Sequence, residues 1–159
     1  MVKAASLAEI KKELQQRPPE ELLALCLRLG RFKKENKELL TYLLFEADDE
    51  DEYVRQVNAH ITELFEGIRR DHAYYARKSS RRILKEVKKY ARYSNAKETE
   101  VSLLICYCSN LGELMSGLPQ SKAMDNLYSR QLALVEKRME SLHPDLQYDF
   151  RIQLEELGL

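Results

Sequence analysis

Residues 101–115, VSLLICYCSNLGELM, form the stretch that decides the fold. When they are spaced at 100° per residue, as on an α-helix, their apolar side chains cover most of the circumference and the polar ones occupy a narrow arc. A helix that is apolar on nearly every side is stable only when other elements surround it. The sequence therefore predicts that this helix is the buried centre of the protein, with Leu104 and Leu111 in its core.

Helical patterns also fill the chain on both sides of this stretch. Ser6 and Glu9 match a capping box at a helix start. Pro18 and Pro19 separate the first two helices, and Gly30 is expected to end the second. No segment alternates apolar and polar residues between turns as a strand does. We expect an all-α protein of seven or eight helices, the later ones long and paired antiparallel, over about 7–16, 19–30, 37–47, 50–67, 71–94, 97–116, 121–142 and 144–157.

The composition indicates one folded domain over residues 1–159. The chain is 44% apolar and 33% charged, with 5 Gly, 4 Pro and a formal net charge of zero. This length suffices to bury a core, and the apolar content is too high for a disordered chain. No apolar run approaches the roughly 18 residues of a membrane-spanning helix, and residues 1–14 are too charged for a signal peptide. We expect no membrane partner and a cytoplasmic location, which the odd number of cysteines also favours.

A faint internal repeat runs along the chain. Pairs of apolar residues seven positions apart recur along the chain, at Leu7/Leu14, Val54/Ile61, Val101/Cys108 and Phe150/Leu157. In two of these copies an acidic residue also stands five positions before an apolar residue that is followed by Arg: Asp49 before Val54-Arg55, and Asp145 before Phe150-Arg151. This layout resembles the junctions of HEAT and armadillo repeats, whose period is about 40 to 47 residues. The resemblance implies stacked antiparallel helical pairs in an α-α superhelix. The alternative is an irregular helical bundle.

The charges are sorted into two opposite blocks. Residues 69–93 carry ten Lys/Arg against two acids, Asp71 and Glu86, whereas residues 46–52 hold six acids. On a helical wheel most of the cations fill one arc, opposite an apolar arc that contains Ile83 and Val87. We define the basic face as the candidate binding surface made by Arg70, Tyr74, Arg77, Lys78, Arg81, Arg82, Lys85, Lys88, Lys89 and Arg92.

The basic face allows three interpretations. It is a solvated surface partly neutralised by the acidic block 46–52, a docking site for an acidic protein surface, or a surface for the phosphates of a nucleic acid. Like charges four residues apart, as at Arg81 and Lys85, destabilise an isolated helix slightly, so this pattern favours an outside partner. Some HEAT-like DNA repair glycosylases bind DNA in a basic groove, but they typically use Trp there, and this chain has none.

No motif for catalysis, a cofactor or a metal is evident. The chain lacks a phosphate loop, a dinucleotide fingerprint, a His-Glu-x-x-His and a Gly-x-Ser-x-Gly. Cys106 and Cys108 point about 200° apart on a helix, so they cannot share one ion. Glu140 and His143 have the spacing of a di-metal ligand pair, but a second such pair is missing. We expect no catalytic residue, no cofactor and no metal.

The cysteines and His60 have structural explanations. We expect burial in the core for Cys26, Cys106 and Cys108. His60 borders an apolar stripe and is expected at the edge of the core. The sequence therefore favours a non-enzymatic binding or scaffold domain that engages a protein partner or a second copy, with a nucleic-acid-binding protein that uses the helix from Arg70 to Arg92 as the alternative.

Overall fold

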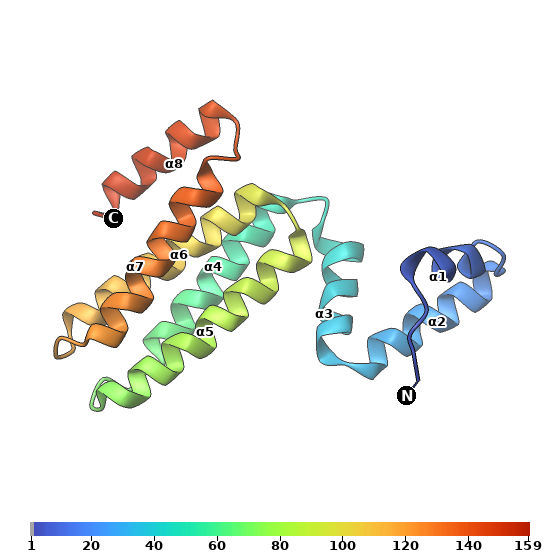
Figure 1. Ribbon diagram of the computed structural model, residues 1–159, viewed down its shortest axis with the longest axis horizontal. Helices are drawn as coiled ribbons and strands as arrows, with labels where there is room; N and C mark the ends of the chain where they lie inside the picture. The colour runs from blue at the N-terminus through green and yellow to red at the C-terminus, as the bar shows by residue number, and fades with distance from the viewer. Residues whose placement is uncertain (1) are drawn as a thin grey trace. The chain divides into compact units, whose positions relative to one another are not determined.

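The computed structural model describes residues 2–159, and every regular element in that range is helical, which confirms the all-α prediction (Figure 1). A π-helical turn at Tyr42–Glu46 continues the third helix. The α-helices are α1 (Leu7–Leu14), α2 (Pro19–Phe32), α3 (Lys34–Thr41), α4 (Glu50–Glu66), α5 (Ala73–Ser94), α6 (Lys97–Ser116), α7 (Lys122–Met139) and α8 (Pro144–Glu156).

The described chain divides into two compact units, residues 1–45 and residues 46–159. The first unit contains α1 to α3, and the second contains α4 to α8. Their internal packing differs sharply, because none of the helices α1, α2 and α3 contains a buried residue, whereas each of α4 to α8 does. The single domain over residues 1–159 that the sequence indicates stays a prediction.

Helix α6 is the centre of the unit 46–159. It packs against α4, α5 and α7, and successive helices run antiparallel with short turns between them (Figure 1). Its observed bounds agree with the predicted range 97–116. Leu104 is 1% exposed and Leu111 is fully buried, which confirms both core predictions. The HEAT or armadillo arrangement of these helices stays a prediction.

Two aromatic contacts fix α6 against its neighbours. The Tyr107 hydroxyl, fully buried, donates a hydrogen bond of 2.9 Å to the backbone carbonyl of Ser80 on α5. The Tyr107 ring also lies 5.4 Å from the Phe65 ring of α4, between ring centroids. Because a buried hydroxyl without a partner is costly, the bond to Ser80 sets the position of α5 along α6.

Local signals explain where the helices of this unit begin and end. The Asp49 carboxylate accepts a hydrogen bond from the Glu52 amide and caps α4. Asn95 follows α5 with a φ of 58°, a left-handed conformation that Asn tolerates better than most residues, and so lets the chain reverse into α6. Ser121 caps α7, and the His143 ring nitrogen caps α8 by accepting from the Asp145 amide.

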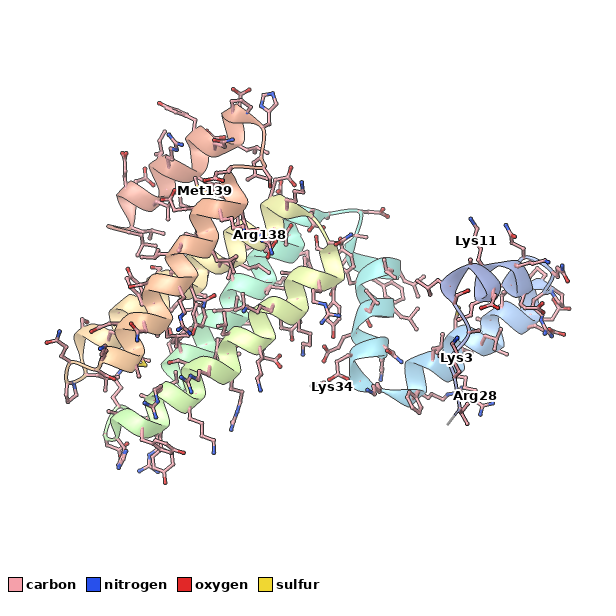
Figure 2. The ribbon with its side chains drawn as sticks, in the orientation of Figure 1. Lys3, Lys11, Arg28, Lys34, Arg138 and Met139 are labelled. Carbon is pink, nitrogen blue, oxygen red and sulfur yellow. The ribbon has the colours of Figure 1, made fainter. Side chains whose placement is uncertain are left out.

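An ion pair and a close approach hold α7 against α6. Figure 2 labels Arg138 on α7, whose Nε lies 3.1 Å from Glu100 Oε1 at the start of α6. A Cβ atom added at Gly112 would meet the Tyr128 ring at 3.4 Å, so glycine lets α7 pack closely there. Helix α8 then packs on α6 and α7 and buries Leu154.

The unit 1–45 corrects three sequence predictions. Helix α2 continues through Gly30 to Phe32, because Gly30 faces Leu40 of α3 and serves close packing rather than a helix end. Cys26 is exposed, not in a core, because none of the helices α1, α2 and α3 contains a buried residue. The third helix also begins at Lys34, earlier than predicted, and the Asn36 amide ties it to the Leu29 carbonyl at 2.8 Å.

None of the helices within residues 2–159 combines the length and the apolar character that crossing a membrane requires.

Truncation of Leu104 to alanine tests the central position of α6. We expect Leu104→Ala to lower the free energy of unfolding by about 2 to 5 kcal/mol, because the cavity left by a buried leucine is only partly refilled. Urea unfolding followed by circular dichroism measures the change. Leu157→Ala, at a position that is 44% exposed, is the control and should change it by less than about 0.5 kcal/mol. A shift of that small size for Leu104→Ala would contradict the assignment.

Candidate functional site

The basic face lies on the side of α5 that turns away from α6. The opposite side of α5 is buried and holds Ala76, Ser80, Ile83, Leu84, Val87 and Ala91. Nitrogen-tipped side chains extend from α5 away from the rest of its unit in Figure 2. The helix has 22 residues and is therefore about 33 Å long. The sequence folds this way because its apolar residues recur at helical spacing and its cations fill the remaining arc.

Most members of the basic face are exposed. These are Arg70, Tyr74, Lys78, Arg81, Arg82, Lys85, Lys88 and Arg92, whereas Arg77 and Lys89 are half-buried. Arg70 lies before the first residue of α5, in the turn after α4, with its guanidinium beside Gly117 of the α6–α7 turn. The structure therefore places all ten predicted residues on or next to one helix, with nine of them on α5 itself.

Two contacts within the basic face involve aromatic rings. The Arg77 guanidinium lies 5.7 Å from the centroid of the Tyr74 ring. The Lys89 ammonium lies 4.8 Å from the centroid of the Tyr90 ring and 2.9 Å from Glu86 Oε2. Such contacts favour a cation over the ring face. Lys89 is thus held by its own chain, while Tyr74 remains 53% exposed at the start of α5.

The other cations of the basic face have no ion pair within residues 2–159. No carboxylate oxygen lies within 4.0 Å of the side-chain nitrogens of Arg70, Arg77, Lys78, Arg81, Arg82, Lys85, Lys88 or Arg92. Like charges stand four residues apart at Arg77/Arg81, Lys78/Arg82 and Arg81/Lys85. Apart from Lys89, the face is therefore a row of positive charges that no carboxylate of the described chain neutralises.

The acidic block 46–52 is used largely at helix ends. Asp49 caps α4, and Glu50 accepts hydrogen bonds from the hydroxyls of Ser94 and Thr99, which join the start of α4 to the α5–α6 turn. Hydrogen bonds from Gln56 and then Arg55 lower the pKa of Glu52. Within the described chain Asp48 and Asp51 form no ion pair with the basic face. Acids at a helix start are stabilised by the helix dipole.

A half-buried polar cluster between α4 and α6 was not found from the sequence. The Asn110 amide donates to Thr62 Oγ1 at 3.3 Å and to the Cys106 carbonyl at 2.9 Å, and the Cys106 sulfur lies 3.7 Å from the Asn58 carbonyl. Burial raises the pKa of the Cys106 thiol, against the opposing hydrogen bonds of Thr62 and Asn110. The cluster is a thiol, a hydroxyl and amides without a base, so it holds the helices together and offers no evident nucleophile.

The remaining sequence candidates are scattered. Cys108 is buried as predicted, whereas Cys106 is only partly buried. The His60 ring meets the Tyr90 ring edge-on at 5.9 Å between centroids. Glu140 stands beyond the end of α7 and His143 caps α8. Residues 2–159 contain no group of three or more His, Cys, Asp or Glu side chains placed to hold a metal.

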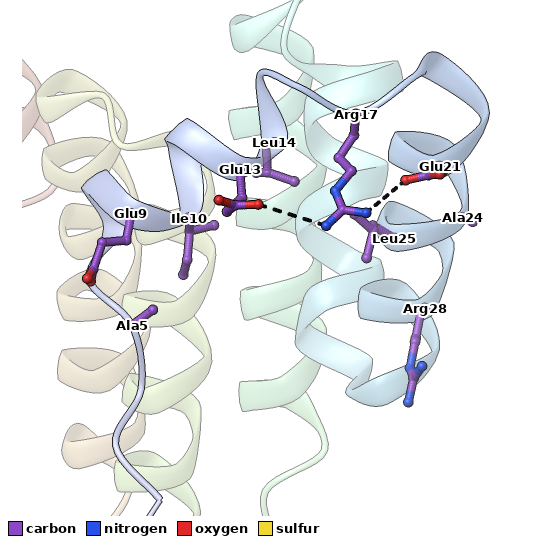
Figure 3. A pocket seen from close by; sticks show the side chains of 10 residues that line it. All are labelled: Ala5, Glu9, Ile10, Glu13, Leu14, Arg17, Glu21, Ala24, Leu25 and Arg28. Atoms are coloured by element: carbon purple, nitrogen blue, oxygen red, sulfur yellow. Dashed lines mark hydrogen bonds and ion pairs between the residues drawn. The ribbon is translucent and has the colours of Figure 1, made fainter.

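A second surface feature, in the unit 1–45, was also missed. A groove of about 530 Å³ lies between α1 and α2 (Figure 3). Ile10, Leu14 and Leu25 line it, and Arg17 lies between Glu13 and Glu21 at one end. Leu25 is the large apolar residue of α2 that lines this groove, and the sequence alone does not show how far α1 lies from it.

Searches of protein-family models, of curated proteins and of solved structures found no match for this chain.

The structure predicts three different reactivities for the three thiols. Cys26 is exposed, Cys106 half-buried and Cys108 fully buried, and burial raises the pKa of the Cys108 thiol to about 12. Because the thiolate is the reactive form, at low micromolar protein and neutral pH Cys26 should react with a chromogenic disulfide reagent first and Cys106 more slowly. Cys108 should react only in denaturant. The variant Cys26→Ser should remove the fast phase of the labelling reaction. Fast labelling of all three thiols in the native protein would contradict the packing of α6.

Replacement of one central lysine tests whether the basic face is strained by repulsion. Lys85→Glu converts the pairs with Arg81 and Lys89 from like to opposite charge, so we expect a stabilisation of about 1 kcal/mol at low salt. Urea unfolding measures it, and 1 M salt should remove most of the gain. Lys85→Gln is the matched control with about half the gain. Destabilisation by Lys85→Glu at low salt would show that Lys85 has a structural role.

Proposed function

We propose that this protein is a non-enzymatic binding or scaffold domain that docks an acidic surface of a protein partner on its basic face. The observation that carries the proposal is the row of eight cations of the basic face, all except Lys89 and its pair with Glu86, that have no carboxylate partner within residues 2–159. Repulsion along this helix is removed when negative charges approach it, so binding of an acidic surface is favoured. The face stands on helices packed around α6, and a rigid support of this kind lowers the entropy lost on docking.

A protein partner is favoured over a nucleic acid by the overall charge. The chain has a formal net charge of zero, and the unit 46–159, which carries the basic face, contains more acidic than basic residues. Proteins that bind nucleic acid through phosphates are commonly basic over the whole domain, because the attraction is long-range. A local acidic patch on a protein needs only the local row of cations.

Nucleic acid is the second candidate, and Tyr74 supports it. This ring is exposed beside the Arg77 guanidinium, and Tyr75 is exposed next to it at 5.5 Å between ring centroids. Exposed aromatic rings among cations are the surfaces on which single-stranded bases stack. We keep this function as the alternative that an experiment must decide.

The proposal includes the broader expectations from the sequence. We propose a cytoplasmic location, which three unpaired cysteines support. We also propose a HEAT-like stacking of helical pairs, supported by the antiparallel packing of α4 to α7. No catalytic residue, cofactor or metal takes part in the proposed function.

Titration of labelled probes decides between the two candidates. The probes are a single-stranded oligonucleotide, a double-stranded oligonucleotide and an acidic peptide with the sequence of residues 46–52, followed by fluorescence anisotropy at 50 and 150 mM salt. We expect no oligonucleotide binding at 150 mM salt. We expect the acidic peptide to bind at 50 mM salt and to lose most of its affinity when Arg77, Arg81, Lys85 and Lys88 are replaced by Gln, since four charges leave the face.

A matched variant controls for net charge. Replacement of Lys122, Arg130, Lys137 and Arg151 by Gln removes the same charge from exposed positions on α7 and α8 and should leave peptide binding nearly unchanged. Micromolar oligonucleotide binding that vanishes in the α5 variant, but not in this control, would overturn the protein-partner proposal in favour of nucleic acid. A loss of a further 1 to 3 kcal/mol with Tyr74→Ala would then assign base stacking to Tyr74.

A further inference from the structure

The helices of the unit 1–45 leave their apolar side chains in water. None of the residues of α1, α2 and α3 is buried. The large apolar side chains of α1 and α2 that are exposed are Leu7, Ile10, Leu14, Leu23, Leu25, Leu27, Leu29 and Phe32. Helices of 8 residues, the length of α1 and α3, are too short to be stable alone in water. Their amphipathic sequences therefore require an element that covers them.

Helix α2 needs neighbours on more than one side. At 100° per residue, its apolar side chains span an arc of about 220°, which is much wider than the stripe of an ordinary surface helix. Helix α3 covers one part of this arc, where a Cβ atom at Gly30 would lie 3.1 Å from the Leu40 side chain. Leu25, near one edge of this arc, also lines the groove that separates α2 from α1, where the other lining residues of α2 are Glu21, Ala24 and Arg28.

The groove has an apolar floor and a rim with charges of both signs. Ile10 and Leu14 of α1 face Leu25 of α2 across it (Figure 3). At one end Arg17, in the turn after α1, lies 3.9 Å from Glu13 of α1 and 3.2 Å from Glu21 of α2, in two exposed ion pairs. Helix-in-groove docking uses this combination of an apolar floor and a polar rim.

The rim chemistry fits a copy of itself. Along the groove stand the carboxylates of Glu9, Glu13 and Glu21 and the guanidiniums of Arg17 and Arg28. A strongly acidic or strongly basic partner would meet like charges there, whereas a second α1–α2 pair, related by a two-fold axis, brings both signs to both sides. An isologous interface of this kind is the commonest way in which identical chains associate.

We propose that two copies of this chain associate through their α1–α2 pairs, which pack face to face over the groove and form an intermolecular four-helix bundle. Ile10, Leu14 and Leu25 of each copy become its core, and the charged rim closes it. This association does not depend on the basic face of α5. It makes the unit 1–45 an assembly element and presents two basic faces in one particle.

Sedimentation equilibrium of the full chain from about 1 to 200 µM tests the proposal. We expect a monomer–dimer equilibrium whose dissociation constant rises at least tenfold in the double variant Leu14→Gln and Leu25→Gln. The control is the double variant Ile152→Gln and Leu157→Gln, with Ile152 on α8 and Leu157 directly after it. The exposed fractions match closely, because Leu14 and Leu25 are 38% and 42% exposed and Ile152 and Leu157 are 38% and 44% exposed. It should leave the dissociation constant within twofold.

The other occupants of the groove give distinct results. A wild-type monomer at every concentration overturns the proposal. If the monomer enhances the fluorescence of a dye for apolar surfaces, and the double variant Leu14→Gln and Leu25→Gln abolishes this enhancement, the groove is open and binds a different protein. If the monomer does not enhance the fluorescence of the dye, another part of the same chain covers the groove. A dimer whose dissociation constant neither double variant raises also overturns the proposal. The variant with Arg77, Arg81, Lys85 and Lys88 replaced by Gln should still dimerise and lose only the binding of the acidic peptide.

Discussion

The burial of α6 is the constraint on which the unit 46–159 depends. Its side chains are apolar on nearly all sides, so α4, α5 and α7 must each give one face to it. Tyr107 adds a directional requirement, because its buried hydroxyl needs the Ser80 carbonyl of α5. Each surrounding helix is then left with one free face. The row of cations on α5 occupies the face that this packing leaves exposed, so the candidate binding surface is a consequence of how α6 is enclosed.

The parts of the fold that depend on local signals could be predicted from the sequence. The bounds of α6 and the end of α5 follow from helical periodicity and from Asn95, and the start of α8 follows from Pro144. The outward direction of the α5 cations follows in the same way, because Ile83 and Val87 fix which side is buried. These features need only spacing along one helix, which a sequence displays directly.

The parts that depend on the fit between elements could not be predicted. An apolar stripe on α2 shows that something must cover Cys26, but not that α1 and α3 leave it exposed. Gly30 has the spacing of a helix end, yet its role is the approach of Leu40, which lies on another helix. The contact between Thr62 and Cys106 likewise joins residues on two helices, and their relative register is a tertiary property. The hydrogen bonds that Glu50 accepts from Ser94 and Thr99 could not be predicted either, because they also join residues on different helices.

The lack of buried residues in α1, α2 and α3 has a consequence for how the chain is made. Synthesis proceeds from the N-terminus, so these helices leave the ribosome before α6 exists, with leucines and phenylalanine in water and no core to enter. The unit 46–159 folds mostly on contacts between helices that are neighbours in sequence, with α4 against α6 as the main exception, and such local contacts form rapidly. Each nascent chain therefore exposes these apolar side chains while the unit 46–159 is being made, and adjacent ribosomes on one message bring such segments close together.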